Sequence, residues 1–146
     1  MIRLAKSDDV VHIKCCAKKA YAPYVERMEK KPAPMIADFA ALVDRRDVFV
    51  LEVDGNLYGY IVCFDTADHF HIENVAVLPE FTGRGYGRKL IGFAETRAQA
   101  QGFSRIELYT NEKMRENLTL YPKLGYEEFA RQKQDGFARV FFRKQL

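Results

Sequence analysis

The sequence contains 146 residues, of which 48% are hydrophobic and 29% are charged, and its formal net charge is +3. This length is typical of one domain, and so small a charge gives little support for a nucleic-acid or membrane partner. The apolar runs are far shorter than the roughly 20 residues of a membrane helix, and no charged-then-apolar leader opens the chain. We therefore expect a single cytoplasmic domain spanning residues 1–146.

The three cysteines fit a reducing compartment. Cys15 and Cys16 are adjacent and Cys63 stands apart, so the count is odd and no CxxC pair exists. An odd number with two adjacent residues makes a poor disulfide framework. We expect buried or half-buried free thiols with no catalytic role.

The first third of the chain predicts one strand and two helices. Residues 2–5 form a short apolar strand, and Ser7 is the expected N-cap of a helix over about 8–21. Prolines then interrupt the pattern. A second helix is expected around 35–43.

The middle of the chain is rich in β-branched and aromatic residues. Runs at 48–53 and 57–64 flank Asp54-Gly55-Asn56, which is a strong hairpin signal. A third strand is expected over 69–78, where Pro79 ends it.

A glycine-rich loop, Gly83–Gly87, leads into the next helix, and Gly102 is its expected C-cap. A strand over about 106–109 and a helix ending at Gly125 follow. Two final strands flank Asp135-Gly136.

These elements give the order β-α-α-β-β-β-α-β-α-β-β. The β-α-β unit after residue 69 should contain parallel strands, whereas the hairpins should be antiparallel. The fold class is therefore α/β, with a mixed, mostly antiparallel central sheet flanked by helices.

The glycine-rich loop predicts a phosphate site. Glycines at alternate positions between a strand and a helix allow close backbone approach and let several N–H groups point at one anion. Arg84, Arg88 and Lys89 stand at the helix start, where the helix dipole disfavours cations unless a polyanion is bound. The spacing fits neither a P-loop nor a dinucleotide fingerprint, since position 88 is Arg and Lys89 precedes Leu.

The sequence resembles the GNAT superfamily of acetyl-CoA-dependent N-acetyltransferases. The run Val75-Ala76-Val77-Leu78-Pro79-Glu80 followed by Thr82-Gly83-Arg84-Gly85-Tyr86-Gly87 resembles the acetyl-CoA motif [QR]-x-x-G-x-[GA]. Thr82 stands where Gln or Arg is usual, which removes a side-chain contact but not the backbone cradle. Asn117-x-x-x-Tyr121-x-x-Leu124-Gly125-Tyr126 resembles the second motif, N-x-x-x-Y-x-x-L-G-F.

The resemblance implies an acetyl-CoA site in which the parallel strands splay apart and Asn117 bonds to the pantetheine arm. The strand would pair with pantetheine through Val75, Ala76 and Val77. The pyrophosphate would be held by Thr82, Gly83, Arg84, Gly85, Tyr86, Gly87 and Arg88.

Acetyl transfer needs a base for the amine, donors for the oxyanion and a proton for the thiolate. Tyr121, which matches the family tyrosine near the sulfur, is the candidate general acid; the alternative is a core tyrosine. Glu73 is the candidate base, directly or through water, with a pKa raised by desolvation; the alternative is a solvated or ion-paired carboxylate. By resemblance, the Val77 N–H is a candidate oxyanion donor.

His69, His71 and Glu73 alternate and so share one strand face. That arrangement permits a metal site or a proton relay, although neighbouring polar residues without either role are commoner. Acyl transfer from a thioester needs no Lewis acid, and we expect no metal requirement.

The acceptor is the least defined part. In the family, the segment between the first two helices borders the acceptor site; here Tyr21 and Tyr24 could wall an amine pocket and Glu26 or Glu29 could attract a cation. The final hairpin, 131–137, could close the other side. A small-molecule amine is favoured over a protein, and a homodimer is left open.

Two other classes of function compete with an enzyme. One is a CoA-binding regulatory or sensor module without turnover, against which Asn117, Tyr121 and Glu73 argue. The other is a protein-interaction domain that uses a sheet edge, which leaves the basic loop unexplained.

Overall fold

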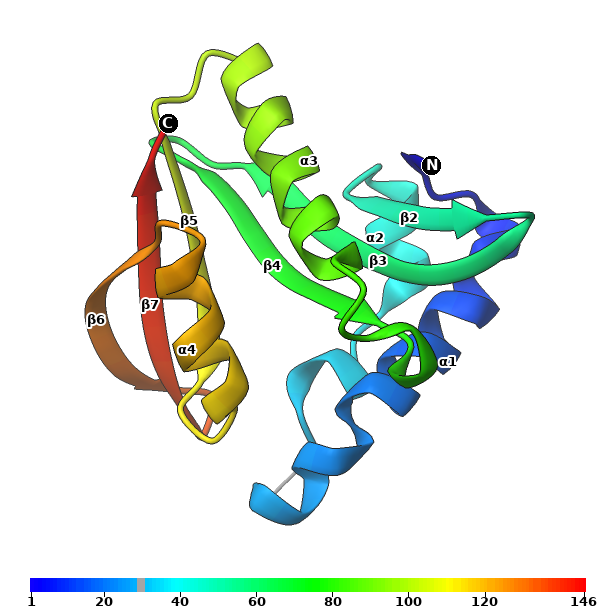
Figure 1. The fold of residues 1–146 in the computed structure, drawn as a ribbon, viewed down its shortest axis with the longest axis horizontal. Coiled ribbons are helices and arrows are strands. Elements are labelled where there is room, and N and C mark those ends of the chain that lie inside the picture. Colours follow the sequence, from blue (N-terminus) through cyan, green and yellow to red (C-terminus); the bar gives the residue numbers. More distant parts are fainter. Residues whose placement is uncertain (29–30) are drawn as a thin grey trace.

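The computed structural model describes residues 1–28 and 31–146, in which seven strands form one sheet in the order β1-β2-β3-β4-β5-β7-β6 (Figure 1). Only β4 and β5 are parallel neighbours; the other neighbouring pairs are antiparallel. The expected mixed, mostly antiparallel α/β sheet is confirmed. The strands are β1 (Ile2–Leu4), β2 (Val48–Val53), β3 (Asn56–Asp65), β4 (Phe70–Val77), β5 (Arg105–Asn111), β6 (Glu127–Gln134) and β7 (Phe137–Gln145).

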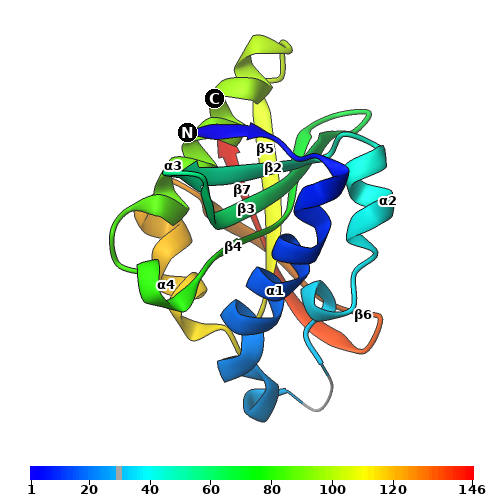
Figure 2. The same ribbon diagram turned by 90° about the vertical axis from the view of Figure 1, so that its right-hand side faces the viewer.

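Helices cover both faces of the sheet. Helices α1 and α2 lie on one face, and α3 and α4 lie on the other (Figures 1 and 2). The helices are α1 (Val10–Tyr21), α2 (Phe39–Asp44), α3 (Tyr86–Ala100) and α4 (Arg115–Lys123). Short 3-10 turns lie at Ser7–Asp9, Ala22–Arg27, Ala33–Met35 and Pro79–Phe81. Among the described residues, no helix is both long and apolar enough to cross a membrane.

The predicted N-cap at Ser7 is wrong. The backbone N–H of Lys6 instead donates to the carboxylate of Asp9 (2.8 Å), and Ser7 begins a 3-10 turn. Asp9 also receives two hydrogen bonds from Arg3 of β1. A carboxylate held by a guanidinium is a stronger acceptor for this helix start than a hydroxyl would be.

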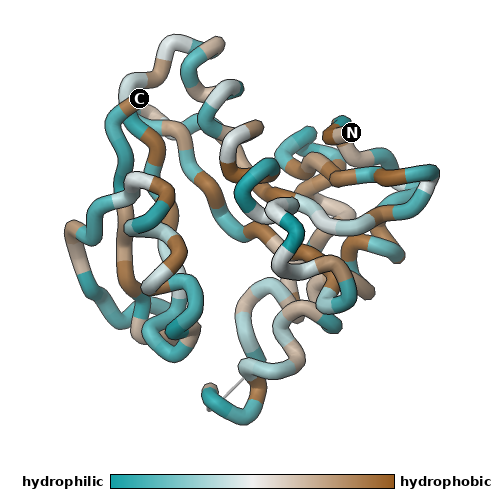
Figure 3. The backbone as a smooth tube through the Cα atoms, viewed as in Figure 1, coloured by the Kyte–Doolittle hydropathy of each residue, from teal (hydrophilic) through white to brown (hydrophobic). Residues whose placement is uncertain are grey.

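Hydrophobic residues fill one core on each side of the sheet. Helix α3 contributes an apolar stripe from Leu90 to Ala98 to the first core, and α1 contributes Ile13 and Ala17 to the second. In Figure 3 the central strands are largely brown, the colour of hydrophobic residues, whereas the outer strand β6 is largely hydrophilic and exposed.

A β-bulge in β4 changes which residues face each core. Its register against β3 passes from Ile72 opposite Cys63 directly to Asn74 opposite Val62, so Glu73 is the extra residue. Before the bulge Ile72 packs on the α3 side, and after it Val75 does, because the inserted residue shifts the alternation by one. Glu73 and Asn74 consequently both turn toward the α1 and α2 side.

Strands β4 and β5 stay paired over only three residue pairs, from Phe70 with Ile106 to Ile72 with Leu108. Beyond this point β4 follows β3 and β5 follows β7, and the two strands diverge (Figure 1). The expected splay of the parallel pair is present. It leaves a gap in the sheet that no other strand of the described residues fills.

Candidate active site

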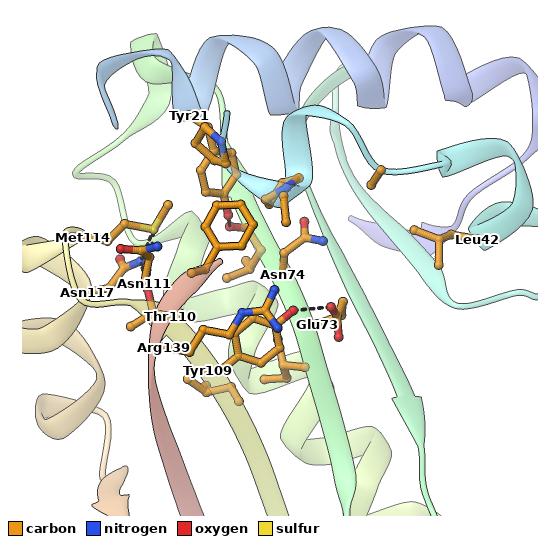
Figure 4. A pocket seen from close by; sticks show the side chains of 18 of the residues that line it. Tyr21, Leu42, Glu73, Asn74, Tyr109, Thr110, Asn111, Met114, Asn117 and Arg139 are labelled. Carbon is orange, nitrogen blue, oxygen red and sulfur yellow. Dashed lines mark hydrogen bonds between the residues drawn. The ribbon is translucent and has the colours of Figure 1, made fainter. Parts of the chain in front are cut away.

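A cavity of about 380 Å³ lies where the strands diverge, and Figure 4 shows the side chains that converge on it. Its walls come from β4, β5, β7, α4 and the segment that links α1 to α2. The apolar part includes Pro32, Ala33, Leu42, Phe64, Ile72, Val75, Leu108 and Met114. The polar part includes Asp38, Arg45, Glu73, Asn74, Tyr109, Thr110, Asn111, Asn117, Tyr121 and Arg139.

Glu73 is held at the cavity wall by two hydrogen bonds. The hydroxyl of Tyr109 donates to one carboxylate oxygen, and Nε2 of His71 lies 2.9 Å from the other. Burial favours the neutral acid, but these two bonds and the charge of Arg139 outweigh it and hold the pKa below its ordinary value. The predicted raised pKa is therefore wrong, and Glu73 is ionised at neutral pH.

Tyr109 and Arg139 are functional candidates that the sequence analysis missed. The Arg139 guanidinium stacks over the Tyr109 ring at 4.3 Å from its centroid, and both side chains line the cavity. Burial and the bond to Glu73 raise the pKa of Tyr109, so its hydroxyl keeps its proton. A signal did exist: each is a polar interruption in a strand whose neighbours are buried or half-buried.

Tyr121 and Asn117, which are four positions apart on α4 and so share one helix face, both line the cavity. Tyr121 is 5% exposed and packs against Tyr126 and Phe142. Burial raises its pKa, so the phenol carries a proton at neutral pH. The Asn117 amide donates to Oγ1 of Thr110 (3.1 Å), which fixes its orientation at the gap.

The glycine-rich loop lies between β4 and α3, with Gly83 at φ 78° and Gly85 at φ 84°. No atom lies within 4 Å of a Cβ built on either glycine, so the space beside the backbone is open. The first hydrogen bond of α3 runs from Lys89 N–H to the Gly85 carbonyl (3.0 Å). The N–H groups of the preceding first-turn residues are thus free to meet an anion.

The loop residues are held by aromatic rings. Phe81 stacks on Tyr58 at 3.6 Å, the Arg84 guanidinium lies over Phe81, and the Lys89 ammonium lies over Tyr86. Thr82, the departure from the family motif, donates its hydroxyl to the Pro79 carbonyl (2.9 Å). It therefore braces the turn rather than reaching outward.

The edge of β4 presents to the gap backbone groups that make no hydrogen bond to β3. Leu78 N–H donates to the Tyr58 carbonyl (2.8 Å), and Ala76 is opposite Tyr60. Hydrogen bonding to β3 therefore falls on Ala76, and Val75 and Val77 direct their N–H and C=O groups away from β3. The Tyr21 hydroxyl donates to the Val75 carbonyl (3.1 Å) across this edge.

Of the residues predicted to border the acceptor site, some line the cavity and others lie outside it. Tyr21 lines the cavity, whereas Tyr24 donates to the Glu116 carboxylate (2.9 Å), outside the cavity lining. Glu26 is exposed and is no part of the described lining, and Glu29 lies outside the described residues. Of the final hairpin, Phe137 reaches the cavity, whereas Arg131 pairs with a neighbouring carboxylate on the surface. Of these candidates, Tyr21 and Phe137 line the cavity, and their place beside an acceptor stays a prediction.

His69 precedes β4, and His71 and Glu73 lie on it; the three side chains form separate pairs. His71 lies against Glu73, and His69 lies 2.6 Å from Asp68 and 3.7 Å from Glu107. Within residues 1–28 and 31–146, no three His, Cys, Asp or Glu side chains are grouped as metal ligands would be. Of the proton relay that the triplet permits, only the contact between His71 and Glu73 is present.

The cysteines lie apart from this chemistry. All three thiols are free; Cys15 is exposed, and Cys16 and Cys63 are buried. Burial raises the pKa of Cys63 to about 12, so its thiol is protonated and a poor nucleophile.

Comparison with known proteins gives concordant matches. A curated relative, an uncharacterised N-acetyltransferase of Methanocaldococcus jannaschii, is 27% identical over 128 residues, which is 83% of this chain and 56% of the relative. The chain thus spans little more than half of that relative's length.

Three solved structures of low sequence identity share the fold. The PaiA N-acetyltransferase of Thermoplasma acidophilum, solved with coenzyme A, has a TM-score of 0.84 at 17% identity and covers 100% of this chain and 98% of its own. A GCN5-related N-acetyltransferase of Rhodopseudomonas palustris has a TM-score of 0.80 at 21% identity, covering 100% and 95%. A Salmonella typhimurium protein solved with its cofactor acetyl-CoA has a TM-score of 0.73 at 22% identity, covering 100% and 93%.

The model of the acetyltransferase (GNAT) family matches residues 13–126, a segment that contains the glycine-rich loop, the splayed strands and the Asn117–Tyr121 face. Because this match covers most of the chain, the protein belongs to the GNAT acetyltransferase family.

Proposed function

We propose that the protein is an N-acetyltransferase that moves an acetyl group from acetyl-CoA to a small primary amine by direct attack. One observation carries the proposal: the gap between β4 and β5 has a helix start with free N–H groups at one end and a cavity with an ionised carboxylate and a protonated phenol at the other. A long molecule with a phosphate end and a reactive end fits such a gap.

The residues present fit acetyl-CoA. The open space beside Gly83 and Gly85 is a cradle that a Cβ would fill, and the first-turn N–H groups of α3 together with Arg84, Arg88 and Lys89 suit a pyrophosphate. The free edge at Val75 and Val77 suits the amides of pantetheine, as in strand addition. The coenzyme A and acetyl-CoA in the similar structures of Thermoplasma acidophilum and Salmonella typhimurium support the same assignment.

Bound acetyl-CoA supplies the acetyl group as a thioester. In our proposal Glu73 receives the proton that the acceptor ammonium must lose, directly or through water, because its carboxylate lines the cavity and is ionised at neutral pH. Its two hydrogen bonds keep it in place but weaken it as a base. Its negative charge also attracts an ammonium into the cavity.

Tyr121 is the proposed donor of a proton to the departing sulfur. Its phenol is buried, protonated and on the cavity wall beside the gap. The N–H of Val77 faces the gap and is the proposed oxyanion donor. Asn117, braced by Thr110, is proposed to bond to pantetheine.

The test is a screen of primary amines with acetyl-CoA, with release of free CoA as the signal. Turnover with at least one amine, and protection against thermal unfolding by CoA alone, are expected. CoA binding without turnover on a broad amine panel would favour a regulatory module. Absence of both would overturn the proposal.

A further inference from the structure

The cavity carries a second, positively charged feature that acetyl transfer itself does not use. Arg139 enters from β7 with its side chain 11% exposed. Its Nη1 lies 3.1 Å from the Gln134 side-chain oxygen and 3.8 Å from the Asp135 carboxylate. Within residues 1–28 and 31–146, its Nε and Nη2 groups make no hydrogen bond, and neither atom is among the fully buried unsatisfied ones, so both keep some exposure to solvent. The guanidinium lies over the rings of Tyr109 and Phe137, and its free N–H groups can be donated to an anion that enters the cavity.

The negative group of the cavity lies one aromatic ring away. Arg139 stacks on the face of Tyr109, and the hydroxyl of the same ring donates to Glu73 (Figure 4). Beside Glu73, the side-chain oxygen of Asn74 is buried without a hydrogen-bond partner. An acceptor's ammonium could donate to both oxygens, while Arg139 remains available to a group of opposite charge.

We propose, on the basis of the function proposed above, that the acceptor is a small amine that also carries a carboxylate. Its ammonium lies against Glu73 and Asn74, and its carboxylate is bound by Arg139. The amine and carboxylate must be separated by only a few bonds, because one tyrosine ring separates the groups that bind them.

The distribution of charge selects this class over its neighbours. The charged residues of the described lining are Asp38, Arg45, Glu73 and Arg139. An oligoamine would place its second cation near a guanidinium, which is unfavourable. A phosphate dianion would lie close to the Glu73 carboxylate with one buried guanidinium to balance it, so a monoanionic carboxylate suits the site better.

The experiment compares matched ligands by calorimetry, in the presence and absence of CoA. Leucine is paired with 3-methylbutylamine, and 5-aminopentanoate is paired with butylamine, so that in each pair the amine lacks only the carboxylate. Spermidine is the oligoamine probe. We expect each carboxylated ligand to bind at least about tenfold more tightly than its matched amine, because it gains one charge-assisted contact. Spermidine should bind more weakly than either carboxylated ligand.

Variants assign the preference to one residue. Arg139→Gln should abolish the difference within the pair, and Arg139→Lys should retain part of it. The control is Arg143→Gln, which removes an exposed arginine from the same strand that also stacks on a ring but lies outside the cavity lining. It should leave the preference unchanged, and thermal unfolding checks that each variant is folded.

Four outcomes would each overturn the inference. The two ligands of each pair could bind equally, no ligand of the panel could bind, spermidine could bind more tightly than the carboxylated ligands, or the two Gln variants could have equal effects. Failure of acetyl transfer is distinguishable from these results. It would appear as absent CoA binding or absent CoA release, whereas the preference is measured as ligand binding alone.

Discussion

The two ends of the gap between β4 and β5 are built in opposite ways. The proposed phosphate end is one continuous stretch, from Pro79 to Lys89, whose backbone N–H groups would bind the ligand and whose side chains are mostly exposed. The cavity end gathers Glu73, Tyr109, Tyr121 and Arg139 from four separate elements. A backbone site survives many side-chain changes, whereas an assembled site depends on the sheet to bring single side chains into contact.

Changing the backbone of the continuous end should have the largest effect. Gly85→Val places a β-branched residue at φ 84° and fills the cradle, so several charge-assisted bonds to pyrophosphate are lost together. We expect CoA affinity, measured by calorimetry, to fall by more than about 10³-fold.

The matched control is Gly102→Val at the far end of α3, where φ is 85°. It carries the same strain and should lower the unfolding temperature without weakening CoA binding. Equal CoA affinity of folded Gly85→Val and wild type would remove the loop from the binding site.

At the assembled end, Tyr121→Phe keeps the packed ring but removes the proposed proton. We expect kcat to fall by roughly 10²–10⁴-fold with little change in acetyl-CoA affinity. The loss should shrink for acyl donors with a more acidic leaving thiol, which depart without help. Tyr126→Phe is the control, since that hydroxyl donates to Glu95 (2.7 Å) outside the cavity. A kcat near the wild-type value would leave Tyr121 with a packing role.

Glu73→Gln removes the proposed base and should lower kcat/KM by about 10²-fold at neutral pH. Because the folded pKa lies below its ordinary value of 4.5, Glu73 keeps its charge as pH falls until that lower pKa is passed. The wild-type acid limb due to Glu73 should therefore lie below pH 4.5. A limb nearer neutrality that persists in Glu73→Gln would belong to another group, and Glu107→Gln on β5 serves as the control.

The smallest effect is expected for Tyr109→Phe, which removes one of the bonds that lower the pKa of Glu73. The acid limb should shift upward by about one pH unit or less, with only a severalfold change in kcat. An unchanged limb would mean that His71 and Arg139 alone set the charge state of Glu73.

The difference between the continuous end and the assembled end of the gap also explains how much of the structure the sequence could predict. Element order, the parallel pair and the glycine-rich loop follow from local patterns, and each is present. The bulge at Glu73 does not follow from alternation, because one inserted residue reverses which side chains face the helices. Arg139 reaches the cavity only through the pairing of β7 with β5, a contact between distant segments. The pKa of Glu73 was predicted in the wrong direction for the same reason, since its hydrogen-bond donor Tyr109 is 36 positions away.

Because only three residue pairs join β4 to β5, the sheet consists of two parts with a short connection between them. Two well-hydrogen-bonded blocks, β1–β4 and β5–β7, share a short seam, and a pantetheine arm along Val75 and Val77 would act as an added partial strand at its open side. Cosubstrate binding should then be visible in amide hydrogen exchange. The edge amides at Val75 and Val77 should exchange quickly in the free protein and slowly when CoA is bound. The cosubstrate would then contribute to the cooperativity of the fold as well as to the chemistry.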